Sequence, residues 1–172
     1  MKKLFLIISI FLLSSYLTTV FAQKPGLEIG DKAPDISLPS PEGKIVTLSS
    51  LKSKVVLIDF WGTWCAPCVK EQPELAKLYK KYKSASFTNG KGFEIFGVSL
   101  DAKKENWDKG IKSQNINWIQ VSDLKFWRSP VAKTYNIQEL PFNLLLDGRG
   151  VILAKNLHGA ELDKAISKFL VK

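Results

Sequence analysis

The sequence predicts an α/β domain built on a mixed β-sheet, and three observations support this. Residues 55–60 (VVLIDF) form a near-continuous apolar run, which is typical of a strand buried on both faces of a parallel sheet. Strand-like and helix-like segments alternate after this run, a pattern that predicts strand–helix–strand units. The end of the chain then carries the signals of a β-hairpin followed by an amphipathic helix, which adds antiparallel strands to the sheet.

Local patterns predict each element in turn. Short apolar runs bounded by proline or glycine indicate strands, and apolar residues at i, i+3, i+4 and i+7 indicate helices. The pair Ser129-Pro130 resembles an N-cap followed by a proline in the first helical turn. We expect strands at 36–38, 45–48, 55–60, 93–100, 118–121, 142–146 and 151–157, and helices at 65–82, 103–114, 129–135 and 162–169.

The composition is that of an ordinary globular protein. Its 172 residues are 45% hydrophobic and 24% charged, and a chain of this length can bury one core without disulfides. No repeat, low-complexity tract or linker follows residue 33, so we expect a single domain over residues 23–172 and a monomer. The net charge of +9 comes from scattered lysines without a recognisable nucleic-acid-binding module, so no nucleic-acid partner is expected.

Residues 1–22 have the pattern of a signal peptide. Two lysines follow the first methionine, residues 4–13 are apolar apart from one serine, and a small-residue site ends at Ala22. This pattern predicts cleavage before Gln23 and a periplasmic or otherwise extracytoplasmic protein. The alternative is an uncleaved membrane anchor, although serines and threonines dilute the second half of a segment that would need about 20 apolar residues to span a bilayer.

The two cysteines lie together in the segment WCAPC, as Cys65 and Cys68. A c-type haem site would need histidine after the second cysteine, where the chain has Val69. A zinc site would need two more nitrogen or sulfur ligands, and His158 is the single histidine. A static disulfide between the two cysteines would close a loop of only four residues. It would stabilise the fold by about 2 kcal/mol, whereas a disulfide that closes a hundred-residue loop contributes about 4.7 kcal/mol. We therefore expect no metal and no cofactor, with zinc and a static bridge kept as the lesser alternatives.

Reversible thiol–disulfide chemistry fits the same position better. The thiolate is the nucleophile, and an unperturbed thiol with a pKa of about 8.5 is only about 3% ionised at pH 7. The unpaired N–H groups and dipole of a helix N-terminus favour the anion, and Cys65 precedes Pro67 where the predicted helix begins. Cys68, one turn further on, can close the disulfide and is expected to be more shielded.

The segment DFWGTWCAPC resembles the active-site segment of thioredoxin-fold proteins. Residues 30–35 (GDKAPD) resemble the start of the extracytoplasmic TlpA/ResA-type reductases, which are redoxin or AhpC/TSA-like proteins. The resemblance implies a thioredoxin-like fold, in which helices flank a central mixed sheet, with an N-terminal β-hairpin and a strand–helix insert. Further matches are Glu71, Pro73, residues 98–101 (VSLD), residues 135–137 (YNI) and Pro141.

Asp59 lies six residues before Cys65, within the apolar strand. An acid there is costly to bury unless it is neutral or paired, so burial would raise its pKa. The resemblance implies that Asp59 exchanges a proton with Cys68. The alternative is a carboxylate that points into solvent at the end of the strand.

The resemblance also implies roles for residues around the cysteines. A glutamate matching Glu71 tunes the thiols in ResA-like reductases, and a solvated helix acid is the alternative. Trp64 is expected beside Cys65 at the surface, with Pro67 as a supporting residue between the cysteines.

Pro141 matches the cis-proline that faces the disulfide across the family's substrate groove. The main chain of Leu140 would then pair with an extended substrate segment. Phe142 departs from the threonine that the family more often has after this proline.

The remaining aromatic residues are expected to be structural. Trp61 is expected in the scaffold, and Trp107, Trp118 and Trp127 in the core or between packed helices. His158 matches a position that lines the thioredoxin groove, but we expect a surface histidine without a role.

Together these features predict an extracytoplasmic thiol–disulfide oxidoreductase that reduces disulfide-containing proteins, in cytochrome c maturation or general redox homeostasis. A membrane thiol donor would restore its dithiol. The dipeptide Ala66-Pro67 lacks the histidine of strongly oxidising relatives, which favours a reducing couple.

Two other classes of function remain as alternatives. Peroxiredoxins share the fold but place threonine three residues before the peroxidatic cysteine, where this chain has Gly62. A non-catalytic binding module that uses the groove or the dithiol, such as a holdase or metal carrier, is the third class.

Overall fold

The computed structural model describes residues 26–171, and the predicted signal peptide lies outside them. Their core is a five-stranded sheet in the order β7-β6-β3-β8-β9. The central strand β3 is parallel to β6 and antiparallel to β8, which confirms the predicted mixed sheet. The strands are β3 (Val55–Trp61), β6 (Phe93–Ser99), β7 (Ile119–Val121), β8 (Phe142–Leu146) and β9 (Ile152–Lys155).

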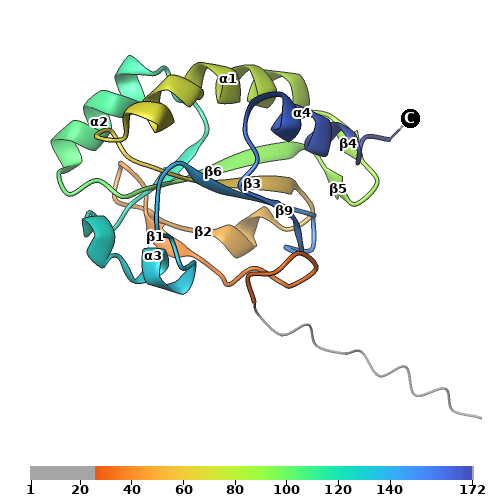
Figure 1. Cartoon of the computed structure of the whole chain (residues 1–172), viewed down its shortest axis with the longest axis horizontal. Coiled ribbons are helices and arrows are strands. Elements are labelled where there is room, and N and C mark those ends of the chain that lie inside the picture. Colours follow the sequence, from red (N-terminus) through yellow and green to blue (C-terminus); the bar gives the residue numbers. More distant parts are fainter. Residues whose placement is uncertain (1–25, 172) are drawn as a thin grey trace, which may run out of the picture.

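Helices cover one face of this sheet, and the N-terminal hairpin lies on the other (Figure 1). All seven residues of β3 are buried, as the continuous apolar run predicts, because both faces are covered. The helical face carries α1 (Ala66–Tyr82), α2 (Lys104–Ser113) and α4 (Gly159–Ser167). The other face carries β1 (Ser37–Pro39), β2 (Ile45–Thr47), the 3₁₀ turn η1 (Leu48–Leu51) and α3 (Pro130–Thr134).

The side chains of β3 alternate between two hydrophobic cores. Leu57 and Trp61 pack under the helices, whereas Ile58 and Phe60 pack against the hairpin side. Asp59 lies two residues from both Leu57 and Trp61, so its side chain points to the same face of the sheet, towards α1. The alternation therefore places a carboxyl group beneath the helix that begins at the cysteines.

One short hairpin and both 3₁₀ turns of residues 26–171, including η1 (Leu48–Leu51), escaped the sequence prediction. A short hairpin of β4 (Ser86–Phe87) and β5 (Gly90–Lys91) follows α1, and a 3₁₀ turn η2 (Phe126–Arg128) precedes α3. Strands of two residues are too short to show a period of two, and a single 3₁₀ turn shows no helical period.

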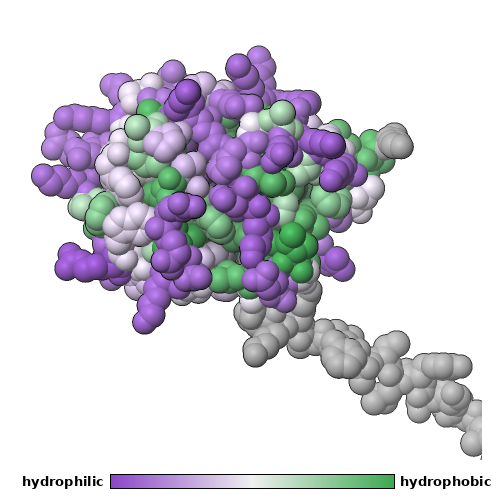
Figure 2. All heavy atoms as spheres, in the orientation of Figure 1, coloured by the Kyte–Doolittle hydropathy of each residue, from purple (hydrophilic) through white to green (hydrophobic). Residues whose placement is uncertain are grey.

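Hydrophilic residues spread over the face visible in Figure 2, with smaller apolar areas between them. Within residues 26–171, no helix has the length and apolar character needed to cross a bilayer. The same residues hold no group of three or more histidine, cysteine or acidic side chains arranged to bind a metal.

Candidate active site

Cys65 and Cys68 form a disulfide at the N-terminus of α1. Cys65 is the N-cap residue, and its Sγ accepts a hydrogen bond from the backbone N–H of Cys68 at 3.2 Å. This N–H is one of the helix-terminal donors that would stabilise a thiolate on Cys65 in the reduced protein. Cys65 is 5% exposed and Cys68 is 1% exposed, so Cys68 is the more shielded of the two, as predicted. Pro67 lies in the first turn of the helix.

The loop between β3 and α1 is held by Asp101, which follows β6 and is buried. Its carboxylate accepts hydrogen bonds from the hydroxyl of Thr63 at 2.5 Å and from the hydroxyl of Ser99 at 2.7 Å. The backbone N–H of Thr63 also donates to it, at 3.2 Å. This network positions the residues directly before Cys65. From the sequence, Asp101 had no assigned role, and its single signal was the family resemblance of residues 98–101.

Asp59 is 2% exposed, which excludes the solvated alternative. Its Oδ2 has no hydrogen-bond partner among the described residues. Burial, followed by the negative charge of Glu71, raises the pKa of Asp59 to about 7, while Gln72 acts in the opposite direction. The direction of this shift agrees with the prediction. A carboxyl group with this pKa can hold or release a proton near neutral pH, as a general acid–base requires.

Glu71 is paired with a residue from the far end of the chain. Nδ1 of His158 lies 2.9 Å from Oε1 and 3.1 Å from Oε2 of Glu71, and Nε2 of His158 lies 3.1 Å from Oδ1 of Asn156. The side chain of Glu71 is only 12% exposed, so it is not a freely solvated helix acid. His158, expected as a surface residue without a role, is half-buried as the N-cap residue of α4.

A shallow groove of about 450 Å³ brings these residues together with the predicted cis-proline. The Leu140–Pro141 peptide bond is cis, as the resemblance implied. The main chain of Leu140 makes no hydrogen bond to any described residue and remains available to an extended segment. The groove is lined by Pro67, Lys70, Glu71, Glu74, Pro141, His158 and Gly159.

Aromatic residues gather around Trp64, which directly precedes Cys65. Trp64 is 45% exposed, as predicted, and its Nε1–H donates to the carbonyl of Leu100 at 3.1 Å. Trp127 was predicted to lie in the core or between packed helices, and this is wrong: it is 38% exposed and packs against Trp64. The reason is that η2 is a surface turn between β7 and α3. The other tryptophans, Trp61, Trp107 and Trp118, are buried as predicted.

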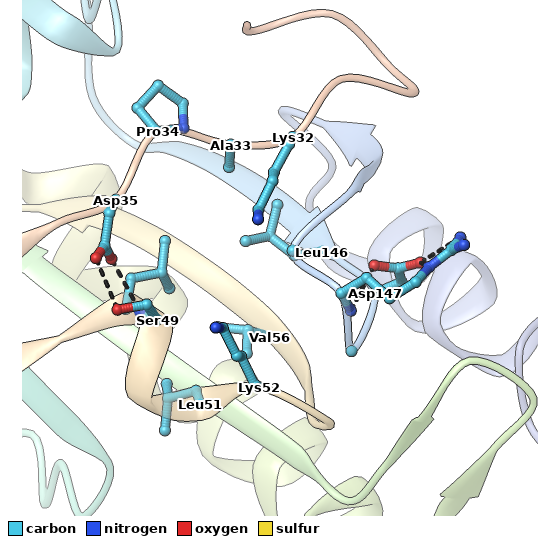
Figure 3. Close-up of a pocket in the computed structure, with 14 residues that line it drawn as sticks. Lys32, Ala33, Pro34, Asp35, Ser49, Leu51, Lys52, Val56, Leu146 and Asp147 are labelled. Carbon is cyan, nitrogen blue, oxygen red and sulfur yellow. Dashed lines mark hydrogen bonds and ion pairs between the residues drawn. The ribbon is translucent and has the colours of Figure 1, made fainter. Parts of the chain in front are cut away.

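A separate cavity of about 340 Å³ lies on the hairpin side of the sheet (Figure 3). Leu146 and Val56 contribute to its apolar lining, and the amino groups of Lys32 and Lys52 point into it. Val56 lies near the start of β3, whereas the cysteines follow the end of that strand. The cavity therefore does not belong to the disulfide site.

The geometry of this site can be compared with known proteins. Residues 29–155 match the model of the AhpC/TSA family. The thiol-disulfide oxidoreductase ResA of Bacillus cereus is 36% identical over 160 residues, which cover 88% of this chain and 82% of that protein. The chain belongs to the AhpC/TSA family. Its Cys65–Cys68 pair is the C-x-x-C pair of a ResA-like thiol-disulfide oxidoreductase.

Solved structures of thiol-disulfide oxidoreductases are also similar to this chain. The thioredoxin domain of a thiol-disulfide oxidoreductase from Bacteroides vulgatus matches with a TM-score of 0.76 at 37% identity, covering 85% of this chain and all of that one. A thiol-disulfide oxidoreductase from Bacteroides fragilis matches with a TM-score of 0.72 at 35% identity, covering 80% of this chain and 98% of that one. The thioredoxin-like fold predicted from the sequence is thereby confirmed.

Proposed function

We propose that this oxidoreductase works outside the cytoplasm and reduces disulfides in other proteins. The observation that carries the proposal is the Cys65–Cys68 disulfide at a helix N-terminus, with the buried Asp59 carboxyl poised at a pKa of about 7. The predicted signal peptide at residues 1–22 supports the location. The protein acts on its substrates as a monomer.

The reaction starts from the dithiol form. The Cys65 thiolate attacks one sulfur of the substrate disulfide, a mixed disulfide forms, and the first substrate thiolate leaves. Cys68 then gives its proton to the carboxylate of Asp59 and attacks the sulfur of Cys65. The Cys65–Cys68 bond forms and the second substrate thiolate leaves, so the substrate gains two electrons that the chain loses.

Residues around the disulfide position the substrate and adjust the proton affinity of Asp59. The free main chain of Leu140 and the edge formed by Pro141 would hold an extended substrate segment beside Cys65. Glu71 adjusts the proton affinity of Asp59 through its charge. A membrane thiol donor would restore the dithiol, because an oxidising compartment does not.

The substrates belong to cytochrome c maturation or to general redox homeostasis, a proposal that rests on the family resemblance. Trapping distinguishes the two. A Cys68→Ala variant cannot resolve its mixed disulfide, so partners stay attached to Cys65 and can be identified after non-reducing separation. Capture of apocytochromes supports the first setting, and capture of many unrelated proteins supports the second.

Reduction of insulin disulfides by dithiothreitol tests the activity itself. We expect the wild type to accelerate the reaction and the Cys65→Ser variant to leave it at the uncatalysed rate. The direction is tested by the reduction potential, which should lie nearer the about −270 mV of thioredoxin than the about −120 mV of a strong oxidant. A potential above about −150 mV, between those two values, would contradict a reductase.

The family match also bears on thiol peroxidase activity, because the AhpC/TSA model matches residues 29–155. Against it stands Gly62, at the position where peroxiredoxins place a threonine. Turnover of hydrogen peroxide above that of the Cys65→Ser variant would favour the peroxidase. Stoichiometric zinc retained by the reduced protein would instead favour a binding module.

A further inference from the structure

We propose that Trp64, Phe126 and Trp127 form a docking surface for an apolar side chain of the substrate polypeptide, about three residues from the cysteine that Cys65 attacks. We call these three residues the aromatic triad. The inference rests on the proposed function and specifies the kind of polypeptide that the site prefers.

The aromatic triad is a continuous exposed surface beside the disulfide. The ring centroid of Trp64 lies 5.0 Å from that of Phe126 and 5.8 Å from that of Trp127, and the two latter rings lie 6.0 Å apart. All three side chains remain more than a third exposed. Trp64 directly precedes Cys65 in the chain, so the surface begins at the residue next to the reactive cysteine. Clustered exposed apolar side chains mark interaction sites more often than scattered ones.

The backbone at Leu124, which precedes η2, and at Phe126, its first residue, has a conformation that bulky residues avoid. Leu124 and Phe126 have φ values of 56° and 55°, in the left-handed region that favours glycine. Hydrogen bonds to the preceding side chains hold the turn: the N–H of Leu124 donates to Ser122 Oγ, and the N–H of Lys125 donates to Asp123 Oδ1. Core packing does not explain a strained phenylalanine that stays exposed. Strain of this kind persists where the presented side chain has a use.

The order of the strands indicates which residue of a bound substrate segment can contact the aromatic triad. Leu140 and Pro141 precede β8, on one side of β3, whereas η2 follows β7, on the other side. The disulfide follows β3 and lies between them in the sheet order. Adjacent strands are about 4.8 Å apart, so two strand spacings equal about three residues of extended chain. A segment aligned along Leu140 can thus place a side chain three residues from its cysteine over the triad.

The chemistry of the surface selects the occupant. Its exposed rings favour an aromatic or large aliphatic side chain. Lys125 precedes η2 and Arg128 is its last residue. Both are exposed and have no salt bridge within residues 26–171, so basic neighbours in the substrate are disfavoured. The preferred substrate is an extended, disulfide-bearing stretch with an apolar residue near its cysteine and no adjacent basic residue.

Two peptides that differ at one position test the proposal. Each carries its cysteine as a mixed disulfide with the same chromophoric thiol, and the residue three positions away is tryptophan in one and serine in the other. We measure the rate constant with which the dithiol protein releases the chromophore. The wild type should prefer the tryptophan peptide about tenfold, equivalent to ~1.4 kcal/mol of contact energy. The preference is measured with tryptophan on each side of the cysteine.

The variant Phe126→Gly with Trp127→Ala should lower this preference to about one. The matched control is Ile45→Ala, which removes an apolar side chain that is 64% exposed on the N-terminal hairpin, and it should keep the wild-type preference. Glycine relieves the left-handed conformation at position 126, so Phe126→Gly alone should unfold at a denaturant concentration no lower than the wild type. A residue with only a structural role would instead lower that midpoint.

The outcomes separate the two proposals. If the wild type releases the chromophore from both peptides at equal rates, or the double variant keeps the preference, the docking surface is wrong and the reductase stands. If the wild type reacts with neither peptide faster than Cys65→Ser, the proposed function fails first. A change in molecular mass between wild type and double variant in light scattering would identify the triad as a contact between copies, and would overturn the docking proposal.

Discussion

Nδ1 of His158 lies 2.9 Å from Oε1 of Glu71, although the two residues are 87 positions apart in the chain. This contact joins the start of α4 to α1, one turn after Cys68. The same carboxylate raises the pKa of the buried Asp59 through its charge. The pair therefore connects the wall of the proposed substrate groove to the group proposed to take the proton of Cys68.

Glu71→Gln should lower the pKa of Asp59 from about 7, because it removes the negative charge that raises this pKa. The pKa should stay above its usual value of 3.8, since burial is the larger cause. The titration of the Asp59 carboxyl carbon by NMR, in the disulfide form, measures the shift. Glu74→Gln is the control, because Glu74 is exposed on the same helix and does not shift Asp59. An unchanged titration of Asp59 in Glu71→Gln would contradict the coupling.

Asp59→Asn should stabilise the protein at pH 8 and not at pH 4. The folded state holds the proton of Asp59 up to about pH 7, whereas the unfolded chain releases it near pH 3.8. Wild-type stability therefore falls as the pH rises between these values, by about 4 kcal/mol at most. Urea unfolding of both proteins at the two pH values measures the difference.

Asp163→Asn serves as a control of opposite sign for that experiment. Hydrogen bonds from Lys81 and Tyr82 lower the pKa of Asp163, so its contribution to stability is lost as the pH falls. The interpretation of Asp59 would be wrong if Asp59→Asn changed stability equally at pH 4 and pH 8.

Asp101→Ala should destabilise the protein by about 1–3 kcal/mol, because it leaves the hydroxyls of Thr63 and Ser99 without their acceptor. It should also speed amide hydrogen exchange at Thr63, whose N–H donates to the same carboxylate. Asp101→Asn keeps one acceptor oxygen, so its stability and its exchange rate at Thr63 should lie between those of the wild type and of Asp101→Ala. Equal exchange at Thr63 in wild type and Asp101→Ala would show that the loop is held by other contacts.

In the reduced protein, iodoacetamide should modify Cys65 at least about tenfold faster than Cys68. Cys65 is the more exposed cysteine and lies at the N-cap, where the helix N-terminus stabilises its thiolate. Mass spectrometry of peptides from a timed reaction gives both rates, and the single-cysteine variants Cys68→Ala and Cys65→Ser provide the controls. Faster modification of Cys68 would reverse the assignment of nucleophile and resolving thiol.

Much of the fold was predictable because its signals are local. The continuous apolar run predicted β3, the helical spacing of apolar residues predicted α1, and the two cysteines stand at the N-cap and in the first turn of that helix. The same run predicted the burial of Asp59, because a strand covered on both faces offers an acid in its middle no access to water. Trp127 was misplaced, since an aromatic residue outside any periodic segment gives no sign of which way it points.

By itself, the sequence determined that both cysteines stand at the start of one helix, directly after a buried strand. Both features follow from spacing and periodicity, which depend only on residues that are close together in the chain. Only the tertiary structure decided which residues meet at this point: Asp101 with Thr63, His158 with Glu71, and Phe126 with Trp64. Each pair joins segments that are brought together by the order of strands in the sheet, and that order depends on the packing of the whole domain.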